Sequence, residues 1–160
     1  MFFCCHHCNS TKLVKFENIL NCTDLDDDIE KKLKYYCKTF PNTDNQVIIE
    51  ALDSDEKVIN TKLLLLAVFL GTENPNKINE SINLRKYLIK EMKKFEDDVI
   101  AYYEIIECDE SHFKSDKDTL LRRIKIHLSA SSPFTSFKRQ IIKDNSKLYQ
   151  EFGQYLTEPL

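Results

Sequence analysis

The longest apolar run in the chain lies within residues 58–70, which read VINTKLLLLAVFL. From Leu63 to Leu70 this run puts apolar side chains on every face that a helix would present. A helix that is hydrophobic all round is one that other elements surround. Ser54 is suited to cap the start of the helix, and Gly71 is suited to end it. Residues 58–70 are therefore predicted to form the central helix of the fold.

Further helices are predicted on both sides of this central helix. Apolar side chains at helical spacing indicate a long helix over residues 77–107. Residues 24–40 carry acidic side chains in the first turn and lysines after it, an order that complements the helix dipole. Shorter helices are expected over about 13–20 and 47–52, where apolar positions recur at the same spacing.

The C-terminal third contains one ambiguous stretch, residues 120–128. Apolar side chains at every fourth position favour a helix there, whereas the alternation from Ile124 to Leu128 favours a short strand. Both interpretations stay open. Residues 129–132 are typical of a break, and Pro133 then suits the first turn of a final helix.

These elements predict an all-α protein, a compact bundle of six to seven helices with the central helix at about 58–70 and the long helix at about 77–107. A chain of 160 residues fits one domain, expected over residues 11–160. Residues 1–10 would precede it as a Cys/His-containing tail or metal knuckle. The chain has only two glycines, which excludes the glycine-rich phosphate cradles of Rossmann and P-loop proteins.

The amino-acid composition indicates where in the cell the protein is expected and what kind of genome encodes it. No apolar run approaches the length of a transmembrane helix, and the first residues lack the basic and apolar regions of a secretory signal. We therefore expect no transmembrane segment and an intracellular protein, cytoplasmic or nuclear. The abundance of Lys, Asn, Ile and Asp, with no Trp, is typical of proteins from AT-rich genomes, including those of DNA viruses and protozoa.

A cysteine- and histidine-rich cluster near the start of the chain is a candidate metal site. Cys5 and Cys8 have the spacing that lets two thiolates hold one zinc ion, and Cys22 and His7 are the candidates for the remaining ligands. Structural zinc is the only cofactor that the sequence suggests. Two alternatives stay open: palmitoylation at Cys4 or Cys5, which alone anchors weakly, or a tail with no ligand.

Positive charge gathers in the C-terminal third, although the formal net charge of the chain is −3. A basic face there could contact the phosphates of nucleic acid, over residues 120–147, or those of an anionic surface. It could also pair with acidic residues or be an ordinary solvated face. The candidate residues are Arg122, Arg123, Lys125, Arg139, Lys143 and Lys147, of which the last three repeat every four residues and would share one helix face.

Two tyrosines are candidates for a protein interface. In each of the pairs 35–36 and 102–103, one ring falls on the apolar stripe of its predicted helix and the other beside it. The rings beside the stripe, Tyr35 and Tyr103, are expected to be exposed, and exposed tyrosines are common at interfaces.

Three functions are compatible with these features. The first is a non-enzymatic helical interaction module, an adaptor, regulator or small complex subunit whose partner is another protein. The second is a zinc-stabilised helical protein that binds nucleic acid or an anionic surface through its basic third. The third is an enzyme with a cryptic site, for which the sequence nominates no catalytic residue. Cys108 could form a nucleophile pair with His112 or His127, but in a chain with six Cys and four His such a pairing is expected by chance.

Overall fold

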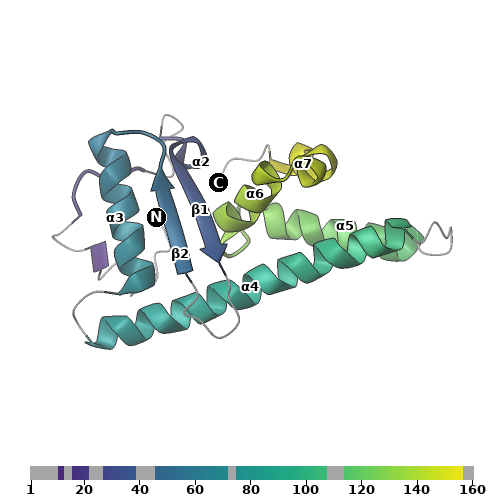
Figure 1. Ribbon diagram of the computed structural model, residues 1–160, viewed down its shortest axis with the longest axis horizontal. Helices are drawn as coiled ribbons and strands as arrows, with labels where there is room; N and C mark the ends of the chain where they lie inside the picture. Colours follow the sequence, from purple (N-terminus) through teal and green to yellow (C-terminus); the bar gives the residue numbers. More distant parts are fainter. Residues whose placement is uncertain are drawn as a thin grey trace. The chain divides into compact units, whose positions relative to one another are not determined.

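The computed structural model describes residues 11–12, 16–21, 27–38, 46–71, 75–107 and 114–156 (Figure 1). Within these ranges it holds six α-helices and one sheet of two strands. The prediction of a mostly helical protein is confirmed, and the described residues add a small two-stranded sheet that was not predicted. The chain divides into two compact units, residues 1–87 and 88–160, which are described separately. The single domain expected over residues 11–160 stays a prediction.

The first unit combines an antiparallel pair of strands with a helix that packs on one of them (Figure 1). In the strand register Leu33 lies opposite Ala51, and Lys38 lies opposite Gln46. The helix that packs on the second strand is α3. The elements of this unit are α2 (Ile29–Lys32), β1 (Leu33–Lys38), β2 (Gln46–Ala51), α3 (Glu56–Leu70) and the first part of α4 (Pro75–Glu107).

One face of the sheet is buried. Tyr35 of β1 lies opposite Ile49 of β2, and both side chains are buried, as are Leu33 and Val47. Alternate residues of a strand point to the same face, so these four side chains share one face. The neighbouring pair on the opposite face, Tyr36 and Ile48, is only half-buried.

Among the described residues of the helices predicted over 24–40 and 47–52, only the single turn of α2 is helical, so the rest of these predictions is wrong there. Aromatic and β-branched side chains, which fit a pleated strand, are concentrated in residues 35–36 and 47–49. The two segments satisfy each other's backbone groups by pairing, and a local period cannot report a contact between distant segments. Residues 16–21 are also not helical, contrary to prediction, although Leu20 is buried.

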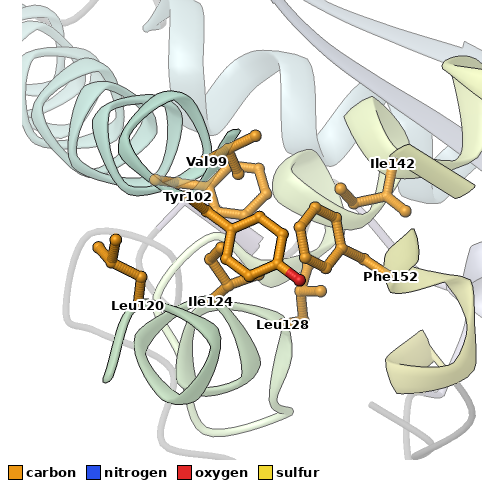
Figure 2. Packing of buried hydrophobic residues seen from close by; sticks show 8 residues of the cluster. Val99, Tyr102, Leu120, Ile124, Leu128, Ile142 and Phe152 are labelled. Atoms are coloured by element: carbon orange, nitrogen blue, oxygen red, sulfur yellow. The ribbon is translucent and has the colours of Figure 1, made fainter. Parts of the chain in front are cut away.

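The second unit is a cluster of helices around an apolar core (Figure 2). Its elements are the remainder of α4 from Leu88, α5 (Lys114–Leu128), α6 (Thr135–Asp144), α7 (Ser146–Phe152) and the 3₁₀ turn η3 (Gly153–Leu156). Each helix from α4 to α7 contributes at least one fully buried side chain. The core residues are Phe95, Val99, Tyr102, Leu120, Ile124, Leu128, Ile142 and Phe152.

The long helix predicted over residues 77–107 is confirmed as α4, and the ambiguous residues 120–128 are helical throughout. Their strand interpretation is therefore wrong: Leu120, Ile124 and Leu128 all lie in the core, as a helical period requires. The predicted final helix is divided at Asn145, whose side chain accepts hydrogen bonds from the first backbone N–H groups of α7. Within the described ranges, each helix is too short or too polar to cross a lipid bilayer.

Candidate functional site

Helix α3 has apolar side chains on its exposed face as well as on its buried face. Val58, Thr61, Val68 and Phe69 are buried. On the opposite side, the exposed fractions are 36% for Ile59, 48% for Leu63 and 51% for Leu70. At 3.6 residues per turn these three side chains and the half-buried Leu66 fall within an arc of about 60°. We call these four residues, Ile59, Leu63, Leu66 and Leu70, the outward face of α3.

Hydrogen bonds in the first turns of α3 fix the orientation of the helix about its own axis. The Asp55 carboxylate caps the helix by accepting a 2.7 Å bond from the Lys57 backbone N–H. The Leu20 N–H donates to the Thr61 hydroxyl at 2.8 Å, and the Asn60 amide donates to the Glu17 carbonyl at 3.1 Å. Since Thr61 is held on the buried side, the outward face cannot turn toward the core of the first unit.

The helix predicted over residues 58–70 is thus confirmed, but it is not buried on every side. The interpretation of this helix as the centre of the whole fold stays a prediction. The exposed leucines have a simple implication. A helix that is apolar all round and buried only on one side presents an apolar surface to its surroundings.

The second unit contains a buried polar cluster, formed by Glu91 and Asp98 of α4, His127 of α5 and Lys138 of α6. Lys138 is completely buried. Its Nζ lies 3.0 Å from Nδ1 of His127 and 3.9 Å from Oε2 of Glu91, and it donates to the Ser132 hydroxyl at 2.9 Å. The cluster therefore joins side chains from three different helices.

The other side of His127 faces an ion pair. Its Nε2 lies 3.3 Å from Oδ2 of Asp98, whose Oδ1 lies 2.6 Å from Nη2 of Arg123. The imidazole also meets the Phe95 ring edge-on, with 5.6 Å between ring centroids. Nδ1 of His127 thus has a hydrogen-bond partner, and Nε2 faces the Asp98 carboxylate, although Oδ2 of Asp98 makes no hydrogen bond of good geometry with the described residues.

Burial sets the protonation of this cluster. It lowers the pKa of His127, and the nearby Lys138 ammonium lowers that pKa further, against the opposing effect of Asp98. Burial also lowers the pKa of Lys138, which the Glu91 carboxylate partly offsets. Glu91 itself has a lowered pKa, chiefly because Lys94 Nζ lies 2.6 Å from its Oε1.

A lysine, a histidine and an aspartate in a row are groups that enzymes use for proton transfer. In this cluster, however, Lys138 and Asp98 are buried, Nδ1 of His127 is hydrogen-bonded to Lys138, and Nε2 faces the Asp98 carboxylate at 3.3 Å. A hollow of about 490 Å³ beside α5 is lined by Ser115, Asp118, Thr119 and Arg122, none of which belongs to the cluster. The geometry therefore favours a structural role for these charges over a catalytic one.

The predicted metal ligands Cys5, Cys8, Cys22 and His7 lie outside the described residues, as do the palmitoylation candidates. Among the residues that the structure describes, no group of three or more His, Cys, Asp or Glu side chains could hold a metal ion. The zinc site stays a prediction.

The structure separates the predicted anion-binding residues. Arg139 is buried, and its Nε donates a 2.8 Å hydrogen bond to the Leu128 carbonyl. Lys143 is exposed on α6, while Lys147 lies beyond the break at Asn145. The prediction that Arg139, Lys143 and Lys147 share one exposed helix face is therefore wrong, since the period of four assumed one unbroken helix.

Three of the basic candidates, Arg123, Lys125 and Lys147, have partners within the second unit. Arg123 pairs with Asp98, and Lys125 Nζ lies 4.4 Å from the centre of the Tyr155 ring. Lys147 Nζ lies 4.6 Å from the centre of the Tyr103 ring. These are cation–π contacts within the second unit. Arg122 is exposed at the hollow beside α5.

The exposure predicted for Tyr35 is wrong, because this residue lies on the buried face of the sheet. Its predicted helix is a strand, in which odd positions turn to the core. Tyr103 is half-buried and packs against the core of the second unit beneath Lys147. Its part in a protein interface stays a prediction.

Two features escaped the sequence analysis. The apolar residues of α3 were visible in the sequence, but apolarity alone does not say which side is covered. The burial of Lys138 had no signal at all, because a lysine beside an apolar stripe is ordinarily solvated.

Comparisons of the chain with protein-family models, with curated proteins and with solved structures found no match in any of the three. The function is therefore inferred from the side chains of the two units.

Proposed function

We propose that the protein is a non-enzymatic interaction module that binds another protein through the outward face of α3. The observation that carries this proposal is the alignment of Ile59, Leu63 and Leu70, each at least one third exposed, along one side of a helix. Single exposed apolar residues are ordinary on protein surfaces. A continuous row along several turns is typical of surfaces that bind a partner.

The spacing of the row indicates the chemistry of the partner. Apolar residues at i, i+4, i+7 and i+11 match the pattern by which an amphipathic helix packs into an apolar groove or against a second helix. The polar residues beside the row, Lys62 and Asn60, would lie at the rim of such an interface. An adaptor, a regulator or a small subunit of a complex would each use a surface of this kind.

The other two functions have less support. An enzyme needs a reactive group that a substrate can reach, and the ionisable side chains of the buried polar cluster are engaged with one another. An anion-binding face needs several free cations side by side, whereas Arg139 is buried and Arg123 is paired with Asp98.

The proposal can be tested by placing a photo-crosslinking amino acid at position 66, in the middle of the outward face, and illuminating the full chain in its native cells. We expect crosslinks to a second protein, mapped by mass spectrometry to an apolar segment of that partner. The substitution Leu63→Glu should abolish these crosslinks because it places a charge in a desolvated contact.

A matched control is Ile126→Glu, which changes an apolar residue of α5 in the second unit that is 60% exposed, against 48% for Leu63. It should leave the crosslinks unchanged, and circular dichroism should show that both variants keep the native helix content. Crosslinks that lead only to other residues of the same chain would contradict the proposal. Equal loss in both variants would contradict it as well.

A further inference from the structure

Only one hydrogen can lie between Nζ of Lys138 and Nδ1 of His127, because a hydrogen bond needs one donor and one acceptor. An ammonium group only donates hydrogen bonds, so Nδ1 of His127 must accept from Lys138 at 3.0 Å with its lone pair. The hydrogen of the neutral imidazole then sits on Nε2, which faces Asp98 at 3.3 Å. A protonated imidazole carries hydrogens on both nitrogens and would oppose a donor with a donor.

Charged groups from all three helices surround this contact. Helix α4 contributes Glu91, Lys94 and Asp98, helix α5 contributes Arg123, and Lys138 itself comes from α6. Asp98 attracts a positive charge on His127, but this carboxylate already faces the Arg123 guanidinium at 2.6 Å. Lys138 repels such a charge at closer range, in a position without access to water.

We propose that His127 is a proton-sensitive latch of the second unit, which ties α6 to α5 through Lys138 while neutral and releases Lys138 when it takes up a proton. Release follows because two cations 3.0 Å apart at a buried position repel each other more strongly than a hydrogen bond can offset. Lys138 contacts His127, Ser132 and Glu91, so the loss of these contacts loosens the packing of α6 on its neighbours. This inference is independent of the surface on α3.

The sign of the pH dependence follows from the lowered pKa of His127. In the unfolded chain an ordinary histidine takes up a proton near pH 6.5, whereas in the folded protein it does so only at lower pH. The contribution of neutral His127 to the free energy of unfolding is therefore complete above pH 6.5, and it is lost as the pH drops below that value. For one proton held only by the unfolded state, the unfolding equilibrium constant rises by up to about tenfold per pH unit.

The test uses the full chain with ¹⁵N-labelled histidine and measures the tautomer and titration of His127 by NMR, together with urea unfolding between pH 7.5 and 5.5. We expect the Nε2–H tautomer at pH 7.5 and a titration midpoint below 6.5. The variant Lys138→Met should raise that midpoint, since it removes the nearest cation that repels a charged imidazole, and should flatten the pH dependence of unfolding.

The matched control Lys143→Met removes an exposed lysine of the same helix and should keep the behaviour of the native chain. A charged His127 at pH 7.5 would overturn the proposal, as would a midpoint that Lys138→Met leaves unchanged. If Lys138→Met does not fold, the native chain still decides: a His127 midpoint at or above 6.5 overturns the latch, and one below 6.5 together with the Nε2–H tautomer supports it.

Discussion

The guanidinium Nε of Arg139, at a buried position in α6, donates a 2.8 Å hydrogen bond to the carbonyl oxygen of Leu128, the last residue of α5. The last carbonyls of a helix have no partner within the helix itself. Arg139 supplies one from the next helix and thereby ties the end of α5 to α6. Because the side chain is buried, its aliphatic carbons contact other protein atoms, whereas those of a surface arginine are partly in water.

We predict that Arg139→Ala destabilises the protein by about 2–4 kcal/mol, since it removes buried packing and leaves a helix-end carbonyl without its donor. Lys143→Ala, four residues further along α6 at an exposed position, should change stability by no more than about 0.5 kcal/mol. Urea unfolding of both variants measures the difference. Equal effects would show that the Leu128 contact contributes nothing.

Asp27 should make the first unit sensitive to acid. Its carboxylate accepts from the Asn21 backbone N–H at 3.0 Å and from Lys32 Nζ at 3.1 Å, and the first of these contacts contributes most to lowering its pKa to about 2. The ordinary value is 3.8, so the folded state binds this proton less readily than the unfolded chain. The stabilisation is therefore complete above about pH 4 and is lost as the pH falls toward 2.

In Asp27→Asn the group that titrates is gone. We expect the urea midpoint of this variant to be lower than that of the native chain at pH 5, and to fall less between pH 4 and 2. Parallel pH profiles for the two proteins would mean that the contacts of Asp27 with Asn21 and Lys32 do not stabilise the fold.

Gly71 ends α3 with φ of 90° and ψ of 173°, a backbone conformation open essentially to glycine alone. A Cβ added there would also lie 3.2 Å from the Cα of Ile78. We predict that Gly71→Ala costs about 1–3 kcal/mol in stability. Thermal unfolding of this variant beside Gly153→Ala provides the comparison.

Gly153 has an ordinary helical backbone, with φ of −57° and ψ of −31°. Its added Cβ would meet only the ring of the exposed Tyr149, which can move aside. Gly153→Ala should therefore stay within about 1 kcal/mol of the native stability. A larger loss at Gly153 than at Gly71 would contradict the description of both glycines.

Local sequence pattern was enough to predict α3 and α4, whereas for α5 it left a helix and a strand both open until the burial of Leu120, Ile124 and Leu128 decided for the helix. The core positions Phe95, Val99 and Tyr102 follow directly from the apolar stripe of α4. The glycine at the end of α3 was also readable from sequence, since few other residues stop a helix in that way.

Tertiary pairing alone decided the rest. Residues 33–38 and 46–51 become strands because they satisfy each other's backbone groups across a gap in sequence. Lys138 and Arg139 can be buried because polar groups on α4 and α5 pair with them. The residues next to them in the sequence do not reveal these partners. The apolar residues of α3 show the same division: periodicity predicts the helix, but only the packing of its neighbours leaves Leu63 and Leu70 exposed. A helical period records which side chains share a face, whereas burial depends on what the remainder of the chain places against that face.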